Sequence, residues 1–252
     1  MIEVKGLSKR FGTVQILTDI SAVFETGKVN QIIGKSGSGK SVLAKCMVGL
    51  HVPEQGKVLY ENRSFYDMDR DQKTEIRQEI GMLFQGSALF DSLTVLQNVM
   101  FPLQMFSHKS KSEMEDRAHS CLKRVNILDK DRLFPAELSG GMQKRVGIAR
   151  AIAMNPKYLF CDEPNSGLDP QTSILIDELI KEITEEFKTT TIVITHDMNS
   201  VVETGENIIF IHKGQKWWQG TGDELLNNDN KELNEFIFAG GLMRRIKRSL
   251  KN

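Results

Sequence analysis

The stretch "IIGKSGSGKSVLAK" (residues 32–45) decides the fold of this chain. Three glycines and three serines follow directly on an apolar run. Glycine weakens the interior of a strand or helix, so the cluster indicates that an exposed backbone serves a purpose here. Gly34, Gly39, Lys40 and Ser41 fit the pattern G-x-x-x-x-G-K-[ST] between a predicted strand (28–34) and a predicted helix (41–50). The pattern predicts a loop whose N–H groups wrap the phosphates of a nucleotide.

The chemistry of that loop assigns roles to the residues that end it. We expect Lys40 to neutralise charge on the β- and γ-phosphates and Ser41 Oγ to bind Mg²⁺. A second motif, "YLFCDEPNSGLDP" (158–170), ends a predicted strand in two acids. Asp162 would reach the same Mg²⁺, and Glu163 is placed to orient or deprotonate the attacking water. His196 ends the apolar strand "TTIVITH" (190–196), where a contact to the γ-phosphate is predicted.

Composition excludes several classes of protein. The 252 residues include 33 basic and 33 acidic side chains, so no global field draws the chain to nucleic acid, and we expect no nucleic-acid partner. Three cysteines, none in a C-x-x-C motif, argue against a disulfide framework or zinc cluster and favour a reducing cytosol. The chain begins without an apolar signal core, and no window is long and apolar enough to span a bilayer.

Apolar periodicity predicts an α/β fold. Short apolar runs at residues 28–34, 80–85, 157–163, 190–196 and 207–214 alternate with helical patterns, which is typical of a parallel sheet. Residues 86–155 read as helical and are expected to form an inserted subdomain. The first 25 residues resemble an antiparallel β-arm that turns at "FGTV", and residues 226–252 read as a basic helical tail.

The stretch "LSGGM" (138–142), which continues "QKRVGIARAIAMNPKYLFCDEP", resembles the signature of the ATP-binding-cassette (ABC) ATPases followed by their second acid motif. The resemblance covers about residues 1–225. It implies one ABC ATPase domain: a P-loop NTPase with a RecA-like parallel-sheet core (about 1–85 and 156–225), an N-terminal antiparallel β-arm and a helical subdomain (about 86–155). It also implies ATP hydrolysis and the cofactors ATP and Mg²⁺.

The resemblance also implies site residues. Gln85, at the end of "IGMLFQ", matches the glutamine that touches Mg²⁺ and the membrane partner, and His196 matches the switch histidine. The implied catalytic residues are Glu163, His196 and Lys40, and the implied Mg²⁺ ligands are Ser41, Gln85 and Asp162. The implied nucleotide-binding residues are Phe11, Gly34, Ser36, Gly37, Ser38, Gly39, Lys40, Ser41, Val42, Gln85, Ser139, Gly141, Asp162 and Asp169.

Two departures from the family pattern leave this chemistry intact. Phe11, implied to stack on adenine, stands where tyrosine is commoner, and Asn165 stands where threonine is frequent. In the family, Ser139 and Gly141 contact the nucleotide held by the other cassette, and the "SGLD" loop that contains Asp169 crosses the interface. One chain carries one loop and one signature, so the resemblance implies a homodimer with ATP sandwiched between two copies.

Three classes of cassette compete: a transporter ATPase, a soluble cassette acting on ribosomes, and a chromosome or repair ATPase. The single cassette and the lack of room for a long coiled coil favour a separate transporter subunit. The stretch "MLFQGSALFDSLTVLQNVMFPL" (82–103) resembles the ATPases of MCE-type (Mla-like) phospholipid transporters of diderm bacteria. An amino-acid or small-solute importer and a division-type system remain alternatives.

The lipid-transporter resemblance also implies partners and a location. Permease subunits are expected to dock near residues 85–103, with Leu89 and Phe90 lining the groove, and an MCE-type lipid-binding subunit is a further implied partner. The expected location is the cytoplasmic face of the inner membrane, as a peripheral subunit.

Overall fold

The computed structural model describes residues 1–239, which form two compact units. The first unit comprises Met1–Glu25, Val29–Met68 and the described residues from Ile194 onward. The second comprises Thr26–Lys28 and Asp69–Val193. The basic residues of the predicted tail lie outside the described residues: Arg244, Arg245, Lys247, Arg248 and Lys251.

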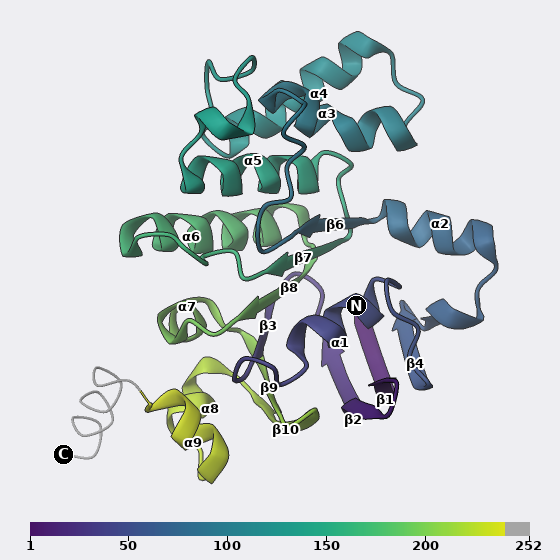
Figure 1. Ribbon diagram of the computed structural model, residues 1–252, viewed down its shortest axis with the longest axis vertical. Coiled ribbons are helices and arrows are strands. Elements are labelled where there is room, and N and C mark those ends of the chain that lie inside the picture. The colour runs from purple at the N-terminus through teal and green to yellow at the C-terminus, as the bar shows by residue number, and fades with distance from the viewer. Residues whose placement is uncertain (240–252) are drawn as a thin grey trace. The chain divides into compact units, whose positions relative to one another are not determined.

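An antiparallel sheet opens the first unit (Figure 1). Strand β1 (Ile2–Phe11) turns into β2 (Val14–Phe24), and the other edge of β1 pairs with β4 (Gln55–Tyr60). The short strand β5 (Arg63–Ser64) completes the order β2-β1-β4-β5 and leads into a 3₁₀ turn at Phe65–Asp67. The predicted N-terminal β-arm is confirmed.

The rest of the first unit is built on buried parallel strands. Strand β3 (Val29–Ile33) pairs in parallel with β9 (Asn207–His212), and β10 (Gln215–Gly220) returns antiparallel to β9. Every residue of β3 is buried, as expected for a strand with both faces covered. Ile33 and Phe210 pack in one core with residues of the later helices. The helices of this unit are α1 (Lys40–Met47), α7 (Met198–Thr204), α8 (Gly222–Leu226) and α9 (Lys231–Ile237).

The second unit combines parallel strands with long helices. Strand β6 (Ile80–Leu83) pairs in parallel with β7 (Tyr158–Asp162), next to β8 (Thr190–Thr195), which leads the chain into the first unit. Helices α3, α4 and α5 pack against one another (Figure 1). The helices are α2 (Arg70–Gln78), α3 (Val95–Phe106), α4 (Lys111–Arg124), a 3₁₀ turn at Pro135–Glu137, α5 (Gly140–Ile152) and α6 (Pro170–Phe187).

Local sequence explains where the helices of the second unit begin. Helices α2, α3 and α4 each begin with a capping box. In a capping box, the side chain of the cap residue and that of the residue three positions later each accept a hydrogen bond from the other's backbone N–H. The pairs are Asp69 with Gln72, Thr94 with Gln97, and Ser110 with Glu113. Helix α6 has Asp169 as its cap and Pro170 at its first position, where a missing N–H costs nothing.

The predicted secondary structure is largely present. Each apolar run forms a strand that is shorter than predicted at one or both ends. Residues 86–155 form helices α3 to α5 and no strand, as expected. The division into an α/β core and an inserted subdomain stays a prediction. None of the helices within residues 1–239 combines the length and apolar character needed to cross a bilayer.

Candidate functional site

The predicted phosphate loop joins β3 to α1 in the first unit. Gly34 has a φ of 150°, and a Cβ there would lie 2.2 Å from the carbonyl oxygen of Ile211 on β9. Gly39 caps α1 with a φ of 105°, and its Cβ would lie 2.6 Å from Leu17 Cδ2. Glycine is therefore required at both positions, and the loop keeps its backbone bare beside the start of a helix.

Lys40, the first residue of α1, is buried. Its Nζ donates hydrogen bonds to the carbonyl oxygens of Gly34 at 2.8 Å and Lys35 at 3.2 Å. The ammonium group therefore folds back over the loop. Ser41 and Val42 follow on the first turn of α1, both half-buried. A glycine-rich loop, a helix start and a cation together are suited to an anion.

Ser38 provides a test of whether phosphate fits this loop. Its Oγ is buried and has no hydrogen-bond partner among the described residues. A buried hydroxyl without a partner costs about 1–3 kcal/mol, so a site of this kind gains from an acceptor or donor that arrives with a ligand. Ser36 and Gly37, on the same loop, are exposed, and a Cβ at Gly37 would meet nothing within 4 Å. A phosphate group fits the loop.

Phe11 and His196 are the other predicted site residues of the first unit. Phe11 ends β1 with its side chain 45% exposed. The ring of His51 meets it edge-on at 5.1 Å between centroids, and Lys9 Nζ lies 5.1 Å from its centroid. His196 is exposed directly after β8, and Asp197 behind it caps α7. The Phe11 ring is thus accessible for stacking.

The two predicted acids and Gln85 belong to the second unit. Asp162 is the last residue of β7, and Glu163 follows with a φ of 49°, in the left-handed region. Because Leu83 of β6 pairs with Cys161 of β7, Gln85 and Glu163 leave the sheet at the same edge. A non-glycine residue in the left-handed region is uncommon and is held there by its surroundings.

Lys144 of α5 bonds to both of these segments. Its side chain is 4% exposed, and its Nζ donates to the carbonyl oxygens of Gln85 and, at 3.2 Å, Glu163. Burial lowers the pKa of Lys144, and the charges of Asp162 and Glu163 oppose that shift. Our sequence analysis missed this residue.

A signal for Lys144 was present in the sequence. The spacing of Lys144, Ile148 and Ala151 follows the i, i+4, i+7 pattern of a helix face, and all three are buried. A lysine at a buried helical position needs acceptors that lie inside the protein.

The predicted signature residues surround a separate cavity in the second unit. Ser139 caps α5, and its Oγ accepts a hydrogen bond from Met142 N at 3.3 Å. A Cβ on Gly141 would lie 2.7 Å from Thr172 Cγ2, which shows how closely α5 approaches α6. The cavity measures about 330 Å³, and its lining includes Ser139, Gly141, Arg145, Gly167, Asp169 and Thr172.

Asp169 is fixed at the edge of that cavity. Its carboxylate accepts hydrogen bonds from Thr172 Oγ1 at 2.6 Å and Thr172 N at 3.0 Å. These bonds lower the pKa of Asp169. The signature and the "SGLD" loop therefore line the same cavity.

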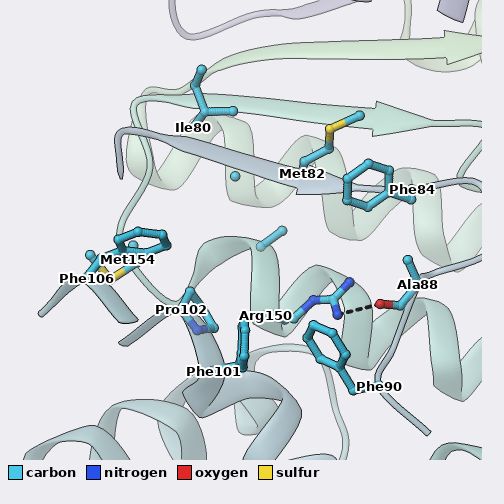
Figure 2. A pocket seen from close by; sticks show the side chains of 12 residues that line it. Ile80, Met82, Phe84, Ala88, Phe90, Phe101, Pro102, Phe106, Arg150 and Met154 are labelled. Atoms are coloured by element: carbon cyan, nitrogen blue, oxygen red, sulfur yellow. Dashed lines mark hydrogen bonds between the residues drawn. The ribbon is translucent and has the colours of Figure 1, made fainter. Parts of the chain in front are cut away.

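The second unit contains a pocket of about 380 Å³, lined by residues that come before and after Gln85 in the sequence (Figure 2). Phe90 lines it, with its ring centroid 4.6 Å from that of Phe101. Leu89 is not among the side chains that line it, and its expected place in a permease groove stays a prediction. Most of the lining is apolar and includes Met82, Phe84, Ala88, Phe101, Pro102, Phe106 and Met154.

Comparison with known proteins places the chain in a family. A family model described as "ABC transporter" matches residues 17–166. The chain is 36% identical over 236 residues to a probable ribonucleotide transport ATP-binding protein, mkl, of Mycobacterium leprae, covering 94% of this chain and 68% of that protein. It is 37% identical over 237 residues to the methionine import ATP-binding protein MetN of Clostridioides difficile, covering 94% and 74%. The chain belongs to the ABC transporter family.

Solved structures agree with this placement. A dimeric post-hydrolysis state of the ATP-binding cassette MJ0796, bound to ADP and phosphate, has a TM-score of 0.80 and 35% identity, covering 88% of this chain and 98% of that one. The cassette cbiO1 of Clostridium perfringens, part of the cbiONQ complex, has a TM-score of 0.84 and 30% identity, covering 100% and 98%. The chain has the α/β fold of a P-loop ABC ATPase, and it is an ATP-binding and ATP-hydrolysing cassette of a membrane transport system.

Proposed function

We propose that this cassette drives a transporter that moves phospholipid between the membranes of a diderm bacterium. The carrying observation is the stretch 82–103, whose sequence resembles the ATPases of MCE-type lipid transporters. This stretch also supplies Met82, Phe84 and Phe90 to the lining of the apolar pocket. ATP binding closes two cassettes on each other, and hydrolysis reopens them. That cycle moves the permease.

In this proposal the loop after β3 holds the triphosphate. Lys40 neutralises the charge that accumulates on the β- and γ-phosphates, and the N–H groups of residues 34–41 wrap them. The unpartnered Oγ of Ser38 supports this, because a phosphate oxygen would satisfy it. Phe11 stacks on adenine through its exposed ring. The loop residues Ser36, Gly37 and Val42 complete the contact.

Mg²⁺ would be held by Ser41, Gln85 and Asp162. All three offer oxygen atoms, which Mg²⁺ prefers, and it usually takes one or two carboxylates together with phosphate oxygens. Residues 1–239 contain no group of three or more His, Cys, Asp or Glu side chains that could hold another metal. The bound ion would supply charge neutralisation at the β- and γ-phosphates.

Glu163 is the proposed general base, and His196 contacts the γ-phosphate. A carboxylate within reach of a water opposite the γ-phosphate would orient that water and accept its proton. The left-handed backbone of Glu163 supports a dedicated role, because such strain persists where the surroundings impose it.

A second copy of the chain is the proposed partner for the composite site. Ser139, Gly141 and Asp169 would contact the nucleotide bound by the other copy. The cavity between α5 and α6 supports this, since it exposes the start of α5 beside Asp169. A helix start favours an anion.

The permease would dock at the apolar pocket, whose lining includes Phe84 and Ala88 on either side of Gln85 in the sequence, so that its movement reaches the Mg²⁺ ligand. The cassette would lie as a peripheral subunit on the cytoplasmic face of the inner membrane. An MCE-type lipid-binding subunit would complete the transporter. The apolar lining supports docking of an amphipathic helix, whose apolar face fills such a groove.

Methionine import is a second candidate. The methionine import protein MetN of Clostridioides difficile is 37% identical over 237 residues, which favours an amino-acid substrate. The pocket would serve either permease, so the pocket does not distinguish the two functions.

The decisive experiment isolates the cassette with its membrane partners in mild detergent and identifies what is bound. We expect co-purified permease with phospholipid retained through washing, and ATP-dependent release of that lipid to acceptor vesicles. A complex that binds and translocates methionine, with no ATP-dependent lipid transfer, would replace the lipid proposal and keep the transporter.

A further inference from the structure

Helix α5 connects two segments that lie far apart in the sequence, the residues after β6 and the residues after β7. We propose that Lys144 is a positioning residue for ATP hydrolysis, which holds the backbone of Glu163 to that of Gln85. The inference rests on the proposed role of Glu163 as the base. It concerns how that base is kept in place.

The contacts of Lys144 are with backbone rather than with a carboxylate. Its Nζ donates to the carbonyl oxygens of Gln85 and Glu163. The carbonyl oxygen of Glu163 also accepts from Ser166 N at 3.2 Å. The carbonyl oxygen of Glu163 therefore accepts two hydrogen bonds, and the residue has the left-handed conformation. A cation that donates to two carbonyl oxygens fixes backbone geometry directly.

A second cation of α5 holds the segment that follows Gln85. Arg150 donates to the carbonyl oxygens of Ser87 at 2.6 Å and Ala88 at 2.7 Å, and the Ala88 bond is drawn in Figure 2. Ser87 and Ala88 have φ values of 61° and 46°, both left-handed. Lys144 and Arg150 thus hold successive parts of one segment, so this segment is expected to move with α5.

Gly147 lies between the two cations and allows the helix to come close. A Cβ there would lie 2.7 Å from Leu83 Cδ1 and 3.6 Å from Ser87 Cβ. The close approach brings Lys144 within reach of its acceptors. Lys144 is itself buried, so its ammonium group depends on acceptors inside the protein.

A positioning role and a purely structural role predict different kinetics. If Lys144 only stabilised the fold, its loss would lower the unfolding temperature without a specific effect on turnover by the folded protein. If it places Glu163, turnover falls while nucleotide binding by the other unit's loop persists, because misplacement of a catalytic group lowers kcat.

The experiment compares Lys144→Met with Arg117→Met in the full chain. Arg117 is the matched control, because it too is a cation that donates to backbone carbonyl oxygens, those of Ile152 and Ala153. Lys144→Met should lower kcat by about tenfold to a hundredfold with KM for ATP within about twofold. Arg117→Met should leave kcat within about twofold at temperatures where it is folded. Lys144→Arg should recover part of the lost kcat.

A double variant tests whether Lys144 acts through Glu163. In a Glu163→Gln background, single-turnover rates should hardly change on adding Lys144→Met, because residues that act as a unit are not additive. Unchanged kcat in folded Lys144→Met, or an equal loss of kcat in Arg117→Met, would overturn the proposal.

If Lys144→Met does not fold, Lys144→Gln, which keeps a donor on a shorter side chain, is judged by the same kcat and KM criteria. Near-normal turnover in Glu163→Gln alone would instead show that Glu163 is not the general base. The two failures are therefore distinguishable.

Discussion

Gln85 and Glu163 lie at matching positions beyond the ends of the neighbouring parallel strands β6 and β7, each two residues past the pair formed by Leu83 and Cys161. Lys144 donates to the carbonyl oxygen of each. The residue proposed to touch Mg²⁺ and the proposed base are thus tied within one compact unit. A change at the apolar pocket can reach the proposed base through α5, because Arg150 lines the pocket and Lys144 of the same helix bonds to Glu163.

Lys40→Ala should weaken ATP binding by about tenfold to a hundredfold, since hydrogen bonds to charged groups contribute about 1.5–3 kcal/mol. The loss reflects the missing cation at the phosphates. Isothermal titration with ATP measures it, and Lys45→Ala on the same helix is the control. Equal affinities for wild type and Lys40→Ala would show that the nucleotide does not bind at this loop.

Ser139→Arg should act in trans. Its arginine obstructs the cavity that would receive the other copy's nucleotide, but its own phosphate loop is intact. We expect the pure Ser139→Arg and Lys40→Ala proteins each to be nearly inactive. A mixed dimer joins one intact loop to one intact signature, so it should regain about half of the wild-type activity per dimer.

The mixing experiment uses differently tagged chains so that mixed dimers can be isolated and assayed. If isolated mixed dimers are as inactive as the parents, the sandwich arrangement is incorrect. Wild-type activity in pure Ser139→Arg would show that the signature of a second copy is not needed.

Phe90→Asp should abolish assembly with the permease and leave ATP binding by the isolated chain within about twofold. The side chain is 42% exposed and lines the apolar pocket, where a carboxylate would be desolvated by an apolar partner. Leu128→Asp is the control, because Leu128 is a 56% exposed apolar residue that does not line this pocket. A pull-down from detergent extracts measures how much permease each variant binds. A normal amount of permease bound to Phe90→Asp would contradict docking at the pocket.

Gly81→Ala should destabilise the fold by about 1–3 kcal/mol. A Cβ at Gly81 would lie 2.2 Å from the carbonyl oxygen of Ala151, so β6 or α5 must shift. Gly86→Ala is the control, because its Cβ would meet nothing within 4 Å. Urea unfolding compares the two, and equal midpoints would mean that the close packing of β6 on α5 is not required.

Motifs and the approximate positions of strands were predictable because their signals are local. The glycine pattern and the apolar run before it located the loop, and the acids of β7 follow from their place at the end of a buried strand. The resemblance, rather than any periodicity, supplied Phe11, Ser139 and Gly141. These expectations concern residues close together in sequence or fixed by a motif.

The contacts that the sequence analysis missed are long-range. Lys144 meets Gln85 and Glu163 only because α5 packs beside β6 and reaches the segments that follow β6 and β7, and no local pattern identifies those acceptors. The left-handed backbone of Glu163 is likewise imposed by its neighbours. Leu89 and Phe90 were both expected in a permease groove because they follow Gln85 closely; only Phe90 lines the pocket, since adjacent residues in a loop need not face the same way.

Glu163→Gln tests the central claim most directly, because it keeps the size of the side chain and removes the base. ATP hydrolysis and size-exclusion chromatography with Mg-ATP are measured on the same preparation, beside the exposed control Glu178→Gln. We predict ATP binding near the wild-type level, turnover lowered by about 10²–10⁴-fold, and an ATP-dependent dimer that persists. Turnover within about twofold of wild type, with no ATP-dependent dimer, would contradict the account.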